Sequence, residues 1–264
     1  MSLGAAGAPD QFEASVAQLE AAGVDSLWLP ETVFGPAVDP FTGMTFALAK
    51  TAHLKVGSGI SVLPVFGLQP AIPGERALFP VPAGQRGAVF DEALALLRLM
   101  LTTDVVSFHG SFFTVEDASV GPLPVKPLDI WLAGSAPAGL RRVGRLGDGW
   151  LGSLLTPAEA GEAVAVINAA ADEAGRQVDA DHFGISLAIT FGGLPDALAA
   201  SIRRRRPDAV PSTLVADGWA GARDLIASFA DAGLSKFVVR PAAAPESFED
   251  FVAGFTRELA PLQT

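Results

Sequence analysis

The chain has 264 residues, of which half are apolar and 18% are charged, a composition typical of globular proteins and not of disordered ones. Its net charge of −11 argues against a nucleic-acid binder, and the lack of cysteine excludes disulfides, thiolate catalysis and cysteine-ligated metals. No apolar run approaches the roughly 20 residues of a membrane span and we recognise no secretory leader, so we expect a cytoplasmic protein without a membrane partner.

One basic run stands out from this acidic background, at Arg203 to Arg206. It follows the helical stretch 197–202 and precedes Pro207, so its cations lie at a helix C-terminus, where the helix dipole favours them. Runs of like charge are usually solvated faces. We therefore interpret this run as a helix end and expect the partners to be small molecules, not nucleic acid.

In chain order, short apolar runs alternate with longer amphipathic stretches. The predicted strands are residues 26–30, 54–63, 130–133, 150–152, 183–190 and 237–240. The predicted helices are residues 11–22, 41–51, 85–102, 136–146, 157–174, 194–204, 220–232 and 247–259, and residues 105–114 predict a hairpin. This alternation predicts a parallel sheet covered by helices. The length suits a (β/α)8 barrel, and an open doubly wound sheet is the alternative.

Six predicted strands are too few for a closed barrel of this kind. We recognise no strand before the first helix, where residues 4–7 are Gly-Ala-Ala-Gly, and no helix between Leu63 and the segment 65–68. Either the barrel is eroded, or the printed chain joins segments across stretches that it does not contain. Our hypothesis is the second, with residues 1–264 forming a single barrel domain from which parts are missing.

Several motifs occur along the chain in a recognisable order. They are GVDSLWLPE at 23–31, KVGSGISVLP at 55–64, RGAVFDEAL at 86–94, VSFHGSFF at 106–113, and IWLAGS at 130–135 paired with LRRVGRLGDGW at 140–150. In this order they resemble the luciferase-like monooxygenase superfamily. Within it, the chain is most similar to the branch of oxidoreductases that depend on the 8-hydroxy-5-deazaflavin coenzyme F420.

The resemblance implies a luciferase-like (β/α)8 TIM barrel with its cofactor at the carboxyl ends of the strands. It also implies an oxidoreductase that transfers a hydride between carbon 5 of the deazaflavin and a small organic substrate. Two alternatives stay open: an FMN-dependent luciferase-like monooxygenase, and a non-catalytic protein that binds flavin or deazaflavin. Homodimers are common in the family, so a homodimer is one expected state.

The resemblance also points to a bend in the second predicted strand. Deazaflavin-dependent members often carry a non-proline cis peptide at the place of Gly59-Ile60, which forms a bulge behind the cofactor ring. Such a bond costs about 3–4 kcal/mol and persists only where its surroundings hold it. Gly59, Ile60 and Ser61 are therefore candidate cofactor-binding residues. The alternative is that Gly57 and Gly59 simply let the strand bend.

A second candidate is the turn Ala133, Gly134, Ser135 and Ala136, which leads from a strand into a helix beginning with Pro137. Free backbone N–H groups and the helix dipole would hold a phosphate there, and Gly134 would allow close approach. Ser135 would add a hydroxyl. The alternative is that Ser135 only caps the helix.

Three further observations concern single side chains. Glu31 ends a strand motif and is the candidate catalytic acid or base, although family members often place a histidine next to it and this chain has Thr32. Arg240 ends the last strand, where a guanidinium suits a cofactor phosphate or carboxylate, or a salt bridge to a neighbouring loop. The three histidines are scattered and no zinc motif is present, so we expect no metal.

Overall fold

The structure of the protein is a computed structural model that describes residues 2–4, 11–30, 38–58, 81 and 84–263. Eight of its strands form one parallel sheet. They are β1 (Ser2–Gly4), β2 (Ser26–Leu29), β3 (Lys55–Ser58), β6 (Trp131–Ala133), β7 (Gly149–Ser153), β8 (Phe183–Thr190), β9 (Ala216–Asp217) and β10 (Lys236–Pro241). Neighbours follow the order β3-β2-β1-β10-β8-β7-β6, and β9 adds two residues beside the end of β8.

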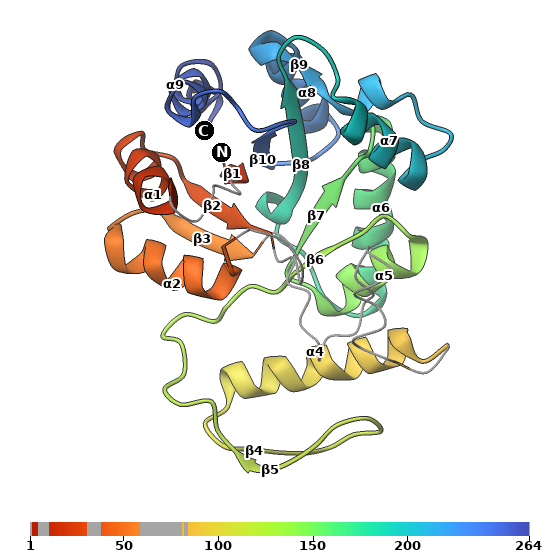
Figure 1. Ribbon diagram of the computed structural model, residues 1–264. Helices are drawn as coiled ribbons and strands as arrows, with labels where there is room; N and C mark the ends of the chain where they lie inside the picture. Colours follow the sequence, from red (N-terminus) through yellow and green to blue (C-terminus); the bar gives the residue numbers. More distant parts are fainter. Residues whose placement is uncertain (1, 5–10, 31–37, 59–80, 82–83, 264) are drawn as a thin grey trace.

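Helices connect these strands and cover the outer face of the sheet (Figure 1). They are α1 (Phe12–Ala21), α2 (Pro40–Lys50), α4 (Arg86–Thr102), α5 (Pro137–Leu146), α6 (Pro157–Glu173), α7 (Asp196–Arg205), α8 (Gly218–Asp231) and α9 (Phe248–Glu258). Short 3-10 turns occupy Ala180–His182, Pro211–Leu214 and Ala260–Leu262. None of the helices in the described ranges is both long and apolar enough to cross a membrane.

The periodicity of the sequence places each predicted helix and five of the six predicted strands within a few residues of the observed ones. Of the strand predicted at 54–63, residues 55–58 form β3, and residues 59–63 lie outside the described residues. The strand predicted at 183–190 is β8, in which seven of the eight residues are buried between the helices and the sheet interior. One prediction is wrong: a strand does precede the first helix. β1 pairs with β2 on one side and β10 on the other, but three residues are too few to show a period of two.

The sheet curls into a barrel instead of lying open. β2 and β6 are separated by five strand spacings, which would put them about 24 Å apart in a flat sheet. Yet the indole rings of Trp28 on β2 and Trp131 on β6 lie 5.8 Å apart, centroid to centroid. The two strands therefore face each other across an interior, as in a (β/α)8 barrel. Among the described residues, β3 and β6 are the edges of the sheet and do not pair with each other.

The main core lies between the sheet and its outer helices. Alternate residues of β8 and β10 point outward into it, including Ile185, Leu187 and Val239, and meet Phe229 of α8 and Phe255 of α9. All five side chains are at most 2% exposed. The remaining residues of each strand point into the interior, because successive side chains of a strand alternate between its faces.

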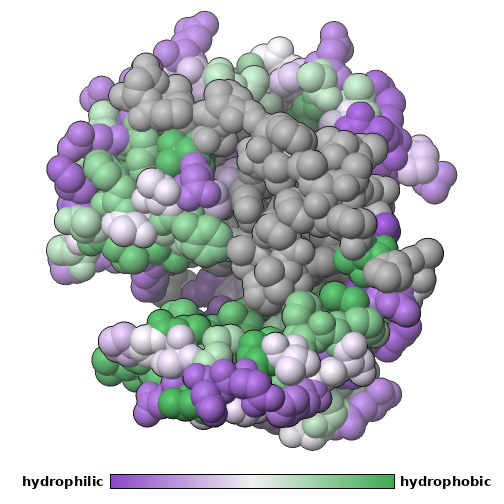
Figure 2. Space-filling model, turned by 60° about the horizontal axis from the view of Figure 1, so that its bottom comes forward, coloured by the Kyte–Doolittle hydropathy of each residue, from purple (hydrophilic) through white to green (hydrophobic). Residues whose placement is uncertain are grey.

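A separate antiparallel hairpin, β4 (Val106–His109) and β5 (Thr114–Ala118), lies against α4 below the barrel. Glu92 of α4 holds its turn, because the carboxylate accepts the N–H groups of Ser111, Phe112 and Phe113, each at 2.8 Å. Figure 2 shows this side of the molecule with apolar and polar side chains mixed. Large exposed apolar side chains here are Leu99, Val105, Phe112, Val120, Val125 and Leu128.

Candidate functional site

The turn after β6 lies at the carboxyl edge of the sheet, where parallel barrels carry their sites. Gly134 has a φ of +106°, a conformation that side chains with a Cβ rarely adopt, and open space lies where its Cβ would be. Its carbonyl is held from behind by the fully buried Trp150, whose Nε1 donates a hydrogen bond of 2.9 Å. The turn is exposed, so a ligand can reach its backbone from the solvent side.

The starts of α5 and α6 differ in how their first N–H groups are used. Both helices begin with Pro-Ala after their N-cap residue. At α6, Thr156 and Glu159 form a complete capping box, in which each side chain accepts a backbone N–H of the other. At α5 the N-cap is Ala136 and no side chain caps the helix. The alternative interpretation, in which Ser135 only caps this helix, is therefore wrong, because Ser135 lies one residue before the N-cap.

This difference leaves the N-terminus of α5 open to a ligand. The first N–H groups of a helix have no partner within the helix, and the helix dipole places partial positive charge at the same end. An alanine at the cap and Gly139 at the third helical position offer no side-chain acceptor. Together with the N–H groups of the Gly134 turn, the helix start has the donor set of an anion site.

Arg240 lies at the same carboxyl edge, on β10. Its register partner on β8 is Ala188, and the two belong to the interior face because Phe237 and Val239 point to the outer core. Burial lowers the pKa of the guanidinium, and the positive charge of Arg205 lowers it further. Arginine stays protonated at pH 7 even so. The side chain is thus a partly buried cation inside the mouth of the barrel.

Helix α7 covers part of this mouth. Its residue Ile202 packs with Ala188 of β8 and with Leu214 and Val215, which forms a second, smaller apolar cluster. The end of α7 is held by Arg206, whose guanidinium donates to the carbonyl of Leu154 and to the Glu159 carboxylate of the α6 capping box. Arg206, one residue of the arginine run, therefore has a structural role. The positive charge of Arg205, the preceding residue, contributes to the lowered pKa of Arg240.

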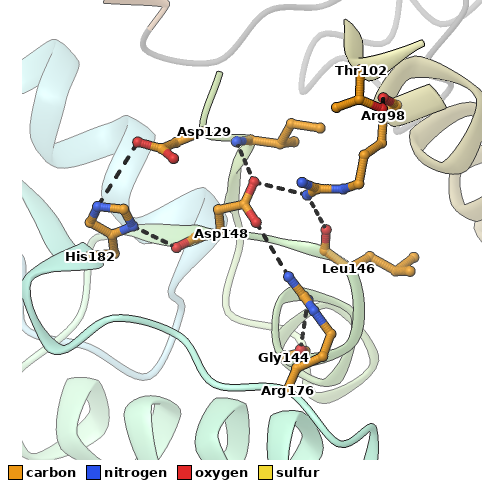
Figure 3. Close-up of polar contacts among 9 residues, drawn as sticks. Arg98, Thr102, Asp129, Gly144, Leu146, Asp148, Arg176 and His182 are labelled. Carbon is orange, nitrogen blue, oxygen red and sulfur yellow. Dashed lines mark hydrogen bonds and ion pairs between the residues drawn. The ribbon is translucent and has the colours of Figure 1, made fainter. Parts of the chain in front are cut away.

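A polar network occupies the opposite, amino-terminal edge of the sheet (Figure 3). Asp148, just before β7, accepts the N–H of Ile130 at 2.9 Å and hydrogen bonds from Arg98 at 2.8 Å and Arg176 at 3.3 Å. His182 donates its Nδ1–H to the Asp148 carbonyl at 2.8 Å. These contacts join α4, the segment after α6 and the strand starts, so they fix the base of the barrel and lie away from its mouth.

The positions predicted from the sequence divide into two groups. Ala133, Gly134, Ser135, Ala136 and Arg240 lie at the carboxyl edge, as expected. The predicted residues Glu31, Gly59, Ile60 and Ser61 lie outside the described residues, and so does Thr32. Sequence reasoning missed Trp150 as the support of the Gly134 turn and Arg206 as the anchor of α7. A buried tryptophan beside a strand motif was the available signal for the first.

Comparison of the sequence with known proteins identifies a family and several relatives. The family model of the luciferase-like monooxygenases matches residues 1–72 and 69–236. An uncharacterised protein of Mycobacterium tuberculosis is 31% identical over 141 residues, which is 53% of this chain and 46% of that protein. The F420-dependent glucose-6-phosphate dehydrogenase of Nocardia farcinica is 25% identical over 81% of this chain and 80% of its own. The chain spans about half the length of the first curated relatives it matches.

Solved structures share the fold at low identity. An F420-dependent secondary alcohol dehydrogenase, in complex with an F420-acetone adduct, superposes with a TM-score of 0.80 at 15% identity, covering 100% of this chain and 98% of that one. The monooxygenase RslO1 from Streptomyces bottropensis gives a TM-score of 0.74 at 18% identity, covering 97% and 94%. These likenesses confirm the luciferase-like (β/α)8 fold. The family match covers most of the sequence, and the chain belongs to the luciferase-like monooxygenase family.

Proposed function

We propose that this protein is an oxidoreductase that transfers a hydride between the deazaflavin coenzyme F420 and a small organic substrate. Family membership supports an oxidoreductase of this class. Relatives matched over half of the chain or more are named F420-dependent glucose-6-phosphate dehydrogenases. A structure with the same fold is an F420-dependent dehydrogenase bound to a coenzyme adduct, which supports the same reaction class.

The observation that carries the proposal is the uncapped start of α5. Its neighbour α6 begins with the same Pro-Ala pair and carries a full capping box, whereas the start of α5 has no side-chain cap and adjoins the exposed Gly134 turn at the carboxyl edge. A coenzyme phosphate would accept the N–H groups of the Gly134 turn and of the first turn of α5, with Ser135 adding a hydroxyl. Gly134 would let the phosphate approach the backbone closely.

The residues of the chain would position the reaction and exclude water from it. When bound, the coenzyme supplies the carbon that gives or accepts the hydride. The Gly134 turn would fix the phosphate end of the coenzyme, and α7 covers the mouth over Ala188. Glu31 follows β2 by two residues in the sequence, and its role as acid or base stays a prediction. Gly59, Ile60 and Ser61 remain the proposed contacts of the ring.

An FMN-dependent monooxygenase is the second candidate. The open helix start would hold the FMN phosphate by the same N–H groups. A solved Baeyer–Villiger monooxygenase in complex with FMN shares the fold, with a TM-score of 0.72 at 14% identity over 97% of this chain. A non-catalytic binding protein is the third, because the residue after Glu31 is a threonine and not the histidine common in the family.

The expected partners are small molecules, and we infer a cytoplasmic location from the lack of cysteine. A homodimer is also proposed from the family resemblance. Light scattering of the purified protein tests it, because a dimer doubles the molar mass of the 27.2 kDa chain.

The test is to titrate the purified protein separately with F420 and with FMN, following quenching of the cofactor fluorescence. Tight binding of F420 with weak or no binding of FMN supports the hydride-transfer proposal. A preference for FMN contradicts it in favour of the monooxygenase. A panel of alcohols, aldehydes and sugar phosphates then tests turnover. If a cofactor binds but none of these compounds causes consumption of the reduced cofactor above background, the result supports a non-catalytic binding protein.

A further inference from the structure

The inward face of β8 carries small side chains. Ile185 and Leu187 point outward into the main core, so the alternate residues of β8 point into the barrel. These inward residues are Gly184, Ser186, Ala188 and Thr190. Barrel interiors are usually filled by bulky branched side chains such as valine, isoleucine and leucine. None of the four inward residues is larger than threonine, so β8 by itself leaves room in the interior.

Ser186 lies beside that room. Seven of the eight residues of β8 are buried, and Ser186, in the middle of the strand, is the one that is partly exposed. Its inward neighbours Gly184 and Ala188 are both buried, so this exposure does not come from an open strand end. The hydroxyl group of Ser186 is therefore accessible from the interior of the barrel.

A second hydroxyl group lies next to that of Ser186. Ser153, the last residue of β7, is its register partner on the neighbouring strand (Figure 1). Register partners point to the same face of a sheet, and neighbouring strands are about 4.8 Å apart. Both side chains thus point into the barrel, close enough for the two hydroxyl groups to bind one oxygen atom. Ser153 is exposed because β7 ends there, at the carboxyl edge.

Within the described residues, neither of these two hydroxyl groups has a hydrogen-bond partner. Other hydroxyl groups of the chain are used by the protein itself. Thr190, on the same inward face, donates to the Gly193 carbonyl, and Ser228 donates to a carbonyl of its own helix α8 at 2.9 Å. Ser153 and Ser186 therefore keep their full capacity to donate and to accept hydrogen bonds for a ligand.

We propose that Ser186 and Ser153 hold the oxygen atom of an alcohol or carbonyl group of the substrate. A hydroxyl group both donates and accepts, so the pair binds either kind of oxygen. The inward residues of β7 and β8 carry no charge, which suits a neutral group. The two serines bind this oxygen and take no part in transferring the hydride or a proton. This inference rests on the proposed function, in which that group belongs to the substrate.

Cyclohexanol and cyclohexanone are the probes, followed by saturation-transfer difference NMR with F420 present and with F420 absent. Both are expected to bind the wild-type protein, weakly because they are small. Ser186→Ala should weaken this binding about threefold to tenfold, since one hydrogen bond is lost. Ser186→Thr keeps the hydroxyl group and should bind the probes more tightly than Ser186→Ala does. Ser228→Ala, which removes a hydroxyl group bonded within α8, is the control and should leave probe binding unchanged.

Two further measurements separate this role from effects on folding and on the coenzyme. The melting temperature of Ser186→Ala should stay within about 2 °C of the wild-type value, because a hydroxyl group without a partner is removed at little cost. Its affinity for F420 should equal that of the wild-type protein. A larger fall in melting temperature overturns the proposal, because the hydroxyl group then bonds within the protein. Weaker F420 binding also overturns it, because the hydroxyl group then serves the coenzyme.

The NMR experiment has two outcomes of its own that overturn the proposal. One is equal binding of the probes by the wild-type protein and Ser186→Ala, and the other is the absence of binding of either probe to the wild-type protein. If F420 does not bind, but the probes bind and lose affinity in Ser186→Ala, the proposed function fails and the oxygen site stands.

Discussion

Trp28 and Trp131 meet edge to face inside the barrel, 5.8 Å apart, although 103 positions of sequence and five strand spacings separate them. Each ring lies over a glycine of a neighbouring strand. A Cβ on Gly57 would come within 3.1 Å of Trp28, and one on Gly149 within 2.5 Å of Trp131. The glycines make room for the indoles, and the indoles fill the interior between the two arms of the curled sheet.

This packing predicts that Gly149→Ala is costly. The added methyl group would overlap the Trp131 ring and approach the His182 carbonyl at 3.0 Å, so we expect a loss of about 1–3 kcal/mol in the free energy of unfolding. The same substitution should cost about 1 kcal/mol less in a Trp131→Ala background, because the overlap with the ring is gone. Urea denaturation of the four proteins of this cycle measures both values.

The control for this cycle is Gly221→Ala, where the new Cβ meets its nearest neighbours at 3.9 and 4.0 Å. Because Gly221 lies inside α8, where alanine is the better helix former, the unfolding free energy should be unchanged or up to about 1 kcal/mol higher than the wild-type value. Purely additive costs at Gly149 and Trp131 would contradict the described interior.

Asp148 is expected to be a stability residue and not a catalytic one. Its carboxylate pairs with Arg98 and Arg176 and accepts the Ile130 N–H, while its side chain is only 20% exposed. Asp148→Asn removes the charge that both guanidinium groups face, and we expect a loss of about 1.5–3 kcal/mol in unfolding free energy. F420 affinity at 25 °C should change little, because the network lies at the other edge of the sheet.

Asp129→Asn is the matched control, since this carboxylate is 44% exposed and its ion pair with His182 spans 4.0 Å. It should cost less than about 0.5 kcal/mol. Equal losses in the two variants would show that the Asp148 network does not stabilise the base of the barrel.

The hairpin below the barrel should loosen in acid. Burial raises the pKa of Glu92, but hydrogen bonds from the Phe112, Phe113 and Ser111 N–H groups outweigh it and the net pKa is lowered. A lowered folded-state pKa stabilises the folded protein above the unfolded-state pKa, and this stabilisation is lost as the pH falls through the folded value. The loss should therefore develop below about pH 4.5.

Glu92→Gln is expected to reduce the slope of stability against pH in that range, because glutamine keeps an oxygen acceptor and has no proton to gain. Thermal unfolding between neutral and acidic pH measures the slope. Glu162→Gln, at an exposed position of α6, is the control and should leave the slope as in the wild type. If Glu92→Gln leaves the slope of stability against pH unchanged, the negative charge of Glu92 does not stabilise the hairpin.

The α5 site can be closed without harming the helix. Ala138 is exposed at the second helical position, where a carboxylate interacts favourably with the helix dipole and repels a phosphate. Ala138→Glu should therefore weaken F420 or FMN binding at least about tenfold while the melting temperature stays the same or rises. Cofactor fluorescence and thermal unfolding are the two measurements.

Ala158→Glu makes the same change at the same position of α6, whose cap is already filled by Thr156 and Glu159. It should leave cofactor affinity within about twofold of the wild type, because no ligand N–H groups are free there. Equal loss in both variants would mean that the negative charge acts generally across the mouth and not at the α5 start.

The alignment with one relative contains positions that this chain does not fill. The alignment with the Nocardia farcinica relative runs over 271 positions, yet it covers 81% of the 264 residues, so that relative has stretches without a counterpart here. The hypothesis that barrel segments are missing between β3 and the later strands stays a prediction. Residues 59–80, where the gap would fall, lie outside the described residues.

Features set by local contacts were readable from the sequence. The β8 strand follows from eight consecutive residues that suit a buried strand, and the capped start of α6 from Thr156, Pro157 and Glu159 within one turn. The position of the Gly134 turn at a strand end was also correctly predicted. The support of this turn by Trp150 was not, because the two residues are 16 positions apart in the chain and meet only in the folded barrel.

By itself, therefore, the sequence determined the alternation of strands and helices, the parallel sheet and the family, because these depend on periodicity and motifs within a few residues. The tertiary structure decided that the sheet curls, that β1 fits between β2 and β10, and that Arg240 lies beside Ala188 on the interior face of the sheet. Each of these depends on which strands become neighbours. That choice is made by packing between residues far apart in the chain, which no local pattern encodes.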